Sequence, residues 1–249
     1  MRTEFKRDYY LMESDKSNWW FASRQDCIIR LLYAHRVPYN ARILEIGCAG
    51  GNIISALQQK GFTNIHGIDN DPDAIAVCKK RGLRDISVQA GEATNFSSDN
   101  FDALIASDVL EHIKDDARAL KEWLRILKPG GLLLLFVPAF SLLWSEKDIW
   151  NEHYRRYRAA SFLPLVEKQG FSIKRYSYWN FLLFFPAVFV RFFSRMIPHR
   201  FKPHPRPAQA PLLINAVFTY FIMAENWLLT KGVRYPVGTS LFVLATKQN

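Results

Sequence analysis

A short run of small residues beside an acid is the part of the sequence best suited to hold a ligand. Gly47 and Gly51 lie between an apolar run that contains Glu45 and a pattern typical of a helix. Glycine lets a backbone approach a ligand closely, and a helix start presents free N–H groups to an anionic group. Asp69 ends the next apolar run, where its carboxylate would accept hydrogen bonds from a ribose diol. The combination predicts a site for a nucleotide-like cofactor.

The glycine spacing argues against a dinucleotide as this cofactor. Residues 47–52 read Gly-Cys-Ala-Gly-Gly-Asn. The second and third glycines of the Gly-x-Gly-x-x-Gly fingerprint are therefore absent. An acid two residues before the first glycine is also no part of that fingerprint.

Two histidine-containing segments could act on an acceptor molecule. Glu111 and His112 follow the fourth apolar run, and they could equally form a helix start that faces solvent. The second segment follows the fifth run and comprises His153, Tyr154, Arg155, Arg156 and Tyr157, with Trp144 upstream. Histidine is the natural base near neutral pH, and paired arginines can clamp a phosphate or carboxylate. We favour an acceptor site over a solvated basic loop, because ligands of open α/β sheets bind beyond the strand ends.

The elements that must position these residues alternate regularly. Apolar runs predict strands at 41–48, 64–69, 85–91, 101–107, 132–138, 171–178 and 239–247. Helical patterns predict helices at 52–60, from Asp71 onward, at 115–127 and at 160–169, with 139–160 expected to be loop-like. Strands that alternate with helices predict an α/β fold with a Rossmann-like, doubly wound, mostly parallel seven-stranded sheet.

Two further segments flank this core. Residues 1–40 are expected to form an N-terminal helical arm that Trp19-Trp20-Phe21 pins to the core, and residues 41–178 the core itself. Residues 179–237 form an apolar helical insertion, with a basic, proline-rich extended loop at 198–211, before the last core strand in 238–249. The insertion has three interpretations: a lid or a dimer interface, which we favour, or an element lying on a membrane surface. A true membrane span is disfavoured, since the last strand must return to the sheet.

With these motifs in place, the chain resembles the class I S-adenosylmethionine (SAM)-dependent methyltransferases. Their signature is acid-x-Gly-x-Gly-x-Gly, which Glu45, Gly47 and Gly51 match, with Ala49 at the middle glycine. The resemblance continues in register across residues 41–138. It implies SAM as cofactor and S-adenosylhomocysteine as product. The cofactor site it implies consists of Glu45, Gly47, Cys48, Ala49, Gly51, Asp69, Asn70, Gly91, Glu92, Ala93, Ser107 and Asp108.

The resemblance also bears on the acceptor side. Asp108, Glu111 and His112 are similar to a metal-binding set in the ubiquinone-pathway O-methyltransferases, with Asp108 in place of a Glu. Most relatives with this segment need no metal, so we predict none. A bacterial, type 11-like branch, often linked to surface-glycan and specialised-metabolite pathways, shares Trp19-Trp20-Phe21 with Arg24 and Trp144-Ser145. We therefore assign His112, His153 and Glu111 to catalysis, and Tyr154, Arg155, Arg156, Tyr157 and Trp144 to substrate binding.

Charge and composition limit the partners. The chain has 249 residues and a net charge of +10. Residues 1–150 hold 19 Lys and Arg against 20 Asp and Glu, while residues 151–249 hold 14 against 3. Three cysteines without a CxxC pair exclude a disulfide framework and a structural zinc site. The first residues lack an apolar signal segment, so we expect a cytoplasmic protein, with peripheral membrane contact as the alternative.

These observations predict a SAM-dependent methyltransferase that acts on a small-molecule or lipid-linked acceptor, at an oxygen atom. Two alternatives stay open: an RNA methyltransferase, suggested by the basic charge, and a non-catalytic interaction protein on the same fold. We disfavour nucleic acid as a partner because the charge coincides with an apolar insertion rather than a polar groove. A homodimer is compatible with the sequence.

Overall fold

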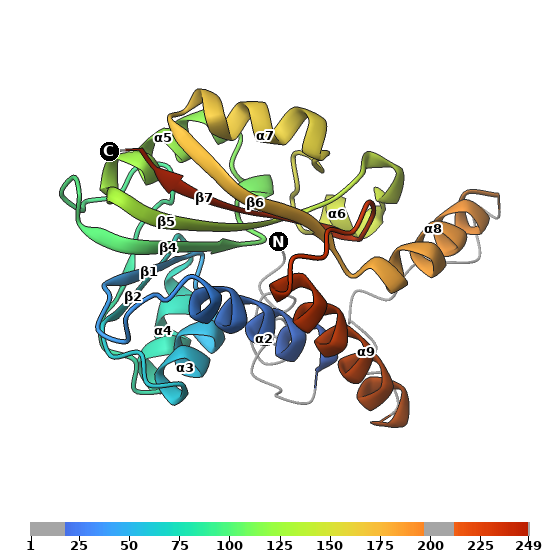
Figure 1. The fold of residues 1–249 in the computed structure, drawn as a ribbon, viewed down its shortest axis with the longest axis horizontal. Coiled ribbons are helices and arrows are strands. Elements are labelled where there is room, and N and C mark those ends of the chain that lie inside the picture. Colours follow the sequence, from blue (N-terminus) through green and yellow to red (C-terminus); the bar gives the residue numbers. More distant parts are fainter. Residues whose placement is uncertain (1–17, 197–211, 249) are drawn as a thin grey trace.

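The computed structural model describes residues 18–196 and 212–248. Its centre is one seven-stranded sheet in the order β3-β2-β1-β4-β5-β7-β6 (Figure 1). All strands run parallel except β7, which is antiparallel to both β5 and β6. The strands are β1 (Ile43–Ile46), β2 (Ile65–Asp69), β3 (Ile86–Val88), β4 (Phe101–Ser107), β5 (Leu127–Pro138), β6 (Phe171–Trp179) and β7 (Ser240–Lys247). The predicted Rossmann-like architecture is confirmed.

Helices cover both faces of the sheet. One apolar core joins the sheet to α2 (Trp19–Ala34), α3 (Asn52–Gln59), α4 (Pro72–Lys80) and α9 (Leu212–Thr230). A second core joins the other face to α5 (Asp116–Ile126) and α7 (Ala159–Lys168), as Figure 1 shows above the sheet. The central strands β1 and β4 are largely buried on both sides, which explains why their sequences are apolar runs, whereas the edge strands β3 and β6 are partly exposed.

Three strands differ clearly in length from their prediction. β1 spans only Ile43–Ile46 instead of 41–48. β3 is only three residues long, because the chain turns at Ala90 and bridges back at Ala93. β5 begins at Leu127 instead of residue 132, since Leu127 pairs with Phe101 before the pairing resumes at Ala103 and Leu132. The Lys-Pro-Gly-Gly segment at residues 128–131 therefore forms a bulge inside the strand.

The segment after β5 is more ordered than the predicted loop. It contains the 3₁₀ turn η2 (Ser141–Leu143) and the short helix α6 (Glu146–Trp150). A capping box between Ser145 and Asp148 starts α6. The two side chains satisfy backbone N–H groups that a helix start leaves free, which lets a five-residue helix persist.

The arm and the insertion pack on each other. The backbone N–H of Trp19 in α2 donates to Asn215 Oδ1 of α9 at 2.9 Å, and Asn226 Nδ2 donates to the Ser23 carbonyl at 2.8 Å. Trp20 packs edge-on against Trp179 with ring centroids 5.1 Å apart. α2 is thus pinned to the core, as predicted. Residues 1–17 of the arm and the loop at 198–211 lie outside the described residues.

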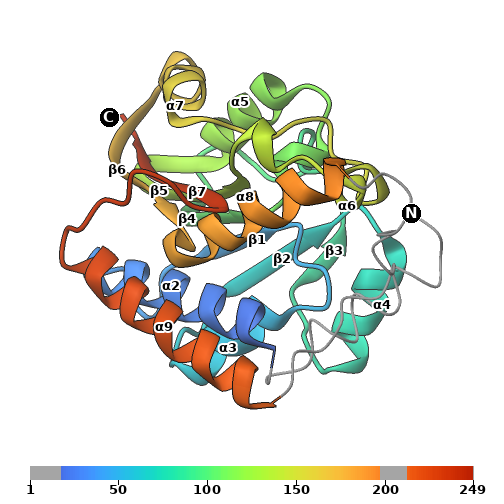
Figure 2. The ribbon, with the colours of Figure 1, turned by 90° about the vertical axis from the view of Figure 1, so that its right-hand side faces the viewer.

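The other helix of the insertion, α8 (Phe181–Met196), leaves the body at the edge where β6 ends (Figures 1 and 2). Both carboxylate oxygens of Glu225, on α9, accept hydrogen bonds from the Phe181 N–H at 3.1 and 3.0 Å. Glu225 therefore caps α8 from a neighbouring helix. In the part of the chain that the structure describes, no helix is long and apolar enough to cross a bilayer.

Candidate active site

The loop between β1 and α3 adopts a conformation that small residues allow. Gly47 and Gly51 have φ of 70° and 76°, and Ala49 has φ of 44°. A Cβ on Gly47 would collide with Val109, and one on Gly51 would collide with Leu83. Both glycines are therefore needed for backbone angle and for space. Because α3 starts directly after the loop, its free N–H groups lie at the carboxyl edge of the sheet.

Asp69 fastens this loop to the end of β2. Its Oδ2 accepts from the Ala49 N–H and its Oδ1 from the Asp71 N–H, each at 2.9 Å. A carboxylate oxygen can accept a second hydrogen bond, and the side chain is only half-buried. Asn70 beside it is exposed, whereas Glu45 on β1 is buried. The carboxylate can therefore order the loop and still face a ligand.

Three further predicted cofactor residues lie at the turn after β3. The Gly91 carbonyl accepts a hydrogen bond from Trp123 Nε1 at 2.8 Å. A Cβ on Gly91 would lie 3.1 Å from the Ile46 side chain, which ends β1. Glu92 is half-buried and Ala93 is exposed. The turn therefore lies at the same edge as the glycine loop.

Arg24 of α2 reaches the end of β4. Its Nη1 lies 2.9 Å from Ser107 Oγ and 3.0 Å from Asp108 Oδ2. Its guanidinium carbon lies 4.2 and 4.3 Å from the ring centroids of Phe136 and Trp179. Asp108 itself has a φ of 56°, a conformation that is rare for a non-glycine residue. The arm thus holds the two predicted residues in place through a buried arginine.

Glu111 is buried, which excludes the alternative of a solvent-facing helix start. It lies in the 3₁₀ turn η1 (Leu110–His112), and its side chain is fully inaccessible. Among the described residues, neither carboxylate oxygen has a hydrogen-bond partner outside Glu111. Burial, together with the nearby Asp108 carboxylate, raises the pKa of Glu111 well above its ordinary value. The neutral acid is therefore favoured.

The structure brings His112 and His153 together from separate segments. Their rings meet edge to face with centroids 4.6 Å apart. Desolvation and the neighbouring His153 ring lower the pKa of His112 to about 4. The ligand atoms of Glu111, His112 and His153 lie within 4.8 Å of one another, so the three side chains could hold a metal ion. His153, rather than Asp108, completes this group.

Asp148 orients His153. The His153 Nδ1 lies 3.0 Å from Asp148 Oδ1, and Arg156 Nε donates to the same oxygen at 2.7 Å. Burial acts to raise the pKa of Asp148, but the hydrogen bonds from His153 and Arg156 outweigh it and hold the pKa below its usual range. Because a carboxylate only accepts hydrogen bonds, Nδ1 carries the proton. The Nε2 atom of neutral His153 is then able to accept a proton.

The predicted arginine pair makes internal contacts. Arg155 Nη1 donates to Asp116 Oδ2 at 2.7 Å, while Arg156 uses Nε and Nη2 on Asp148 and Nη1 on the Ala139 carbonyl. Tyr157 is buried and its hydroxyl lies 3.2 Å from Asp116 Oδ2. Binding of an anionic acceptor by this pair stays a prediction, and it would require donors that are now engaged.

Tyr154 and Trp144 remain available to a ligand. Tyr154 has 55% of its surface exposed, and its backbone N–H donates to the Glu111 carbonyl at 2.8 Å. Trp144 is half-buried in the segment between η2 and α6. Tyr154 directly follows His153, and Trp144 directly precedes Ser145 at the start of α6, so both offer apolar surface in the segment that carries His153.

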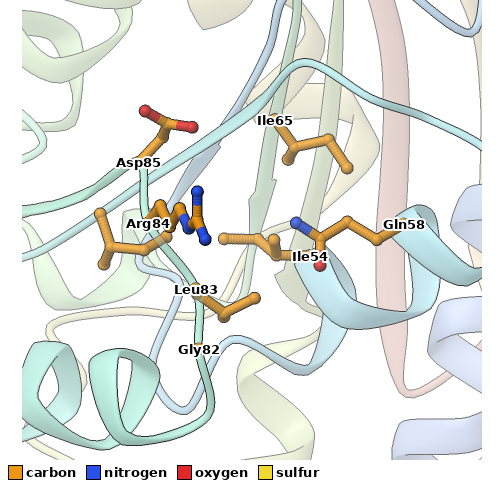
Figure 3. Close-up of a pocket in the computed structure, with 8 residues that line it drawn as sticks. Ile54, Gln58, Ile65, Gly82, Leu83, Arg84 and Asp85 are labelled. Carbon is orange, nitrogen blue, oxygen red and sulfur yellow. The ribbon is translucent and has the colours of Figure 1, made fainter.

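A hollow of about 210 Å³ elsewhere on the molecule is not this site. Ile54, Gln58 and residues 82–86 line it (Figure 3). Ile65 and Ile86, which begin β2 and β3, form its wall. The hollow therefore lies at the amino ends of the strands, opposite the edge that carries Asp69 and Gly91.

Two functional candidates were missed from the sequence. Asp148 orients His153, and Arg24 positions Ser107 and Asp108. An acid five residues before His153 was a detectable signal for Asp148. For Arg24, the only signal in the sequence was its position close to the aromatic triplet at 19–21. Its contact partner Ser107 on β4 lies 83 residues further along the chain.

Comparison with known proteins agrees with this geometry. Residues 44–135 match the family described as "Methyltransferase domain". EEF1A lysine methyltransferase 2 of Homo sapiens is 27% identical over 168 residues, which cover 60% of this chain and 68% of that protein. The ubiquinone biosynthesis O-methyltransferase of Xanthomonas oryzae pv. oryzae is 29% identical over 147 residues, which cover 51% of this chain and 61% of that protein.

A solved structure shares the fold. It is the Haemonchus contortus phosphoethanolamine N-methyltransferase 2 in complex with phosphomonomethylethanolamine and S-adenosylhomocysteine. It superposes with a TM-score of 0.60 at 16% identity, over 90% of this chain and 53% of the other. The matches cover the core and only part of the relatives' length, so they bear on the cofactor domain rather than on the acceptor.

Proposed function

The core of this chain is a class I SAM-dependent methyltransferase domain, and from this premise we propose that the protein methylates an oxygen atom of a small or lipophilic acceptor. The hydrogen bond between His153 and Asp148 is the observation that favours oxygen as the methylated atom. A hydroxyl must lose a proton when it accepts a methyl group, and an oriented neutral histidine can take that proton. The similarity to the Xanthomonas relative, an O-methyltransferase, supports the same choice.

The residues at the carboxyl edge fit SAM. SAM supplies a methyl group made electrophilic by a sulfonium. We assign Asp69 to the ribose diol and Gly91, Glu92 and Ala93 to the adenine. The loop from Gly47 to Gly51 offers small residues and backbone N–H groups for the remaining part of the ligand.

The chain's own residues then have limited chemical work. His153 Nε2 would take the proton of the acceptor hydroxyl when its oxygen receives the methyl group that bound SAM would supply. Asp148 stabilises the resulting imidazolium and keeps the ring oriented. Positioning of the acceptor supplies much of the remaining acceleration. We assign His112 to the wall of this site, where it can donate or accept a hydrogen bond to the acceptor, and the buried, neutral Glu111 to the support of that wall.

Aromatic side chains support a lipophilic acceptor. Phe140 stacks on Tyr178 with centroids 4.6 Å apart and lies 5.4 Å from Phe184 of α8. Trp144 and Tyr154 add further aromatic surface nearby. Such an environment favours an acceptor with an apolar body, including a lipid-linked one. A glycan, lipid or specialised-metabolite pathway is compatible with such a molecule.

The RNA alternative receives less support from the site. Arg155 and Arg156, which stand beside the histidines, are paired with Asp116 and Asp148. Their charge is therefore largely neutralised instead of being offered to phosphates.

The test is transfer of a trideuterated methyl group from labelled SAM. The full chain is incubated separately with phenolic and sugar-like compounds, with a lipid extract and with RNA. Mass spectrometry then locates the label. We expect it on an oxygen of an apolar compound. Label confined to RNA, or to a nitrogen, contradicts the proposal.

A variant pair sharpens this test. His153→Ala should lose transfer while SAM binding by calorimetry stays unchanged. His35→Ala removes an exposed histidine at the end of α2 and serves as the matched control. Equal transfer by the two variants would refute the role of His153 as base.

A further inference from the structure

α8 carries apolar side chains that the rest of the described chain leaves uncovered. The helix is 16 residues long, and none of its side chains from residue 181 to 194 is buried. Phe189 is 64% exposed and Phe192 is 59% exposed. Isolated exposed apolar residues are ordinary, but a continuous group marks a surface that meets a partner. The group on α8 consists of Leu182, Phe185, Phe189, Val190, Phe192 and Phe193.

α9 contributes a second group at its outer end. Val217, Tyr220 and Phe221 are exposed there, Tyr220 at 74%. The inner half of the helix packs on the core through Ile222 and Leu229, while Trp227 and Leu228 on the same half stay exposed. Figures 1 and 2 show α8 and α9 extending on the side of the molecule where the parallel strands end. We call the exposed groups of both helices the tip surface.

The part of the sequence that carries the tip surface is basic. From residue 168 to 249 the sequence has 11 Lys and Arg and a single acid, Glu225. Glu225 is buried and holds the start of α8.

We propose that the tip surface docks on an anionic lipid bilayer, with the two helices lying in the interface. The exposed phenylalanines suit the apolar layer of a bilayer, and the basic part of the sequence that carries them suits the negative head groups above that layer. A second copy of the chain would bring two such basic surfaces together, which like charges oppose. RNA would attract the charge but would leave the apolar side chains in water. The described helices are too short or too polar to span, so contact stays interfacial.

This surface lies on the side of the sheet that carries the candidate active site. Phe184 of α8 contacts Phe140, which follows β5. An acceptor held in the bilayer would therefore approach the histidine pair from the membrane side. Docking does not require catalysis, so it can be tested apart from the proposed methyl transfer.

The experiment is flotation of the full chain with lipid vesicles. Vesicles of phosphatidylglycerol and phosphatidylcholine are compared with vesicles of phosphatidylcholine alone. We expect binding to the anionic vesicles, weakening as salt is raised, and weak binding to the zwitterionic ones. The triple variant Phe185→Ser, Phe189→Ser and Val190→Ser should bind the anionic vesicles about tenfold more weakly.

A matched control and a charge variant complete the test. Val88→Ser changes a valine of similar exposure on β3 and should leave binding unchanged. Arg191→Gln on α8 should weaken binding about fivefold. Failure of the intact chain to float, equal binding to both vesicle types, or a dimer in light scattering that the triple variant abolishes would each overturn the proposal. SAM binding in solution reports on the proposed enzyme separately.

Discussion

Replacing Glu225 by Gln should remove a pH dependence from the stability of the protein. Burial raises the pKa of the Glu225 carboxyl from its ordinary value of 4.5 to about 7, although backbone N–H groups at the start of α8 partly offset the effect. An acid whose pKa is raised on folding contributes stability below its unfolded pKa. That contribution is lost as pH rises through the folded pKa. The free energy of unfolding should therefore fall between about pH 4.5 and pH 7.

The size of the effect follows from the shift. A displacement from 4.5 to about 7 at about 1.4 kcal/mol per unit corresponds to roughly 3 kcal/mol. Glu225 has only 4% of its surface exposed, so solvent screening reduces this little. The glutamine side chain would keep an oxygen that can accept from the Phe181 N–H and would have no charge to bury. The difference in free energy of unfolding between the variant and the unmodified chain should thus increase by about 3 kcal/mol in favour of the variant as the pH rises from 4.5 to 8.

The assay is urea unfolding of both proteins, followed by circular dichroism at a series of pH values. The difference between variant and unmodified chain is the relevant quantity, because other groups, Glu111 among them, also titrate. Glu167→Gln on α7 changes an exposed glutamate and should give a difference independent of pH. A pH-independent difference for Glu225→Gln would refute the reasoning.

The cofactor and acceptor sides allow three further predictions. Asp69→Ala should weaken SAM binding at least about tenfold in calorimetry, since ribose hydrogen bonds and the Ala49 contact are lost together. Unchanged affinity in the folded variant would remove the ribose role. Asp148→Asn should lower kcat roughly a hundredfold and leave the affinity for SAM unchanged. Pre-steady-state kinetics measures the first effect and a binding assay measures the second. Exhaustive chelation should leave transfer unchanged if His153 acts as a free base. Loss of activity that Mg²⁺ restores would instead assign Glu111, His112 and His153 to a metal ion.

The sheet could be predicted from the sequence because its information is local. Each central parallel strand is buried on both faces and therefore reads as an apolar run, as β4 does within its observed bounds. The start of β5 could not be read in this way, because the bulge at 128–131 depends on pairing with Phe101. α6 is short and polar, and it depends on the Ser145–Asp148 capping box together with the contacts of Asp148.

The candidate site was only partly predictable, because some of its contacts join segments that are far apart in the sequence. The glycine loop and Asp69 end two strands that follow each other in the chain, so their types and spacing carried the signal. The burial of Glu111 and the contact between His112 and His153 come from packing between segments about 40 residues apart. Arg155 forms an ion pair with Asp116, and Arg156 forms one with Asp148. Counting charges along the sequence does not predict these pairs.

Arg24 shows why the arm and the insertion belong to the same site as the glycine loop. Its guanidinium bonds Ser107 at the end of β4 and Ser240 at the start of β7, the first strand after the insertion. The ion pair with Asp108 is mostly buried, and such pairs gain little net stability after desolvation. Such an ion pair instead fixes the positions of its two side chains relative to each other. Arg24 therefore positions Asp108 beside Glu111 and the histidines, and it does so only when α2 and β7 are both in place.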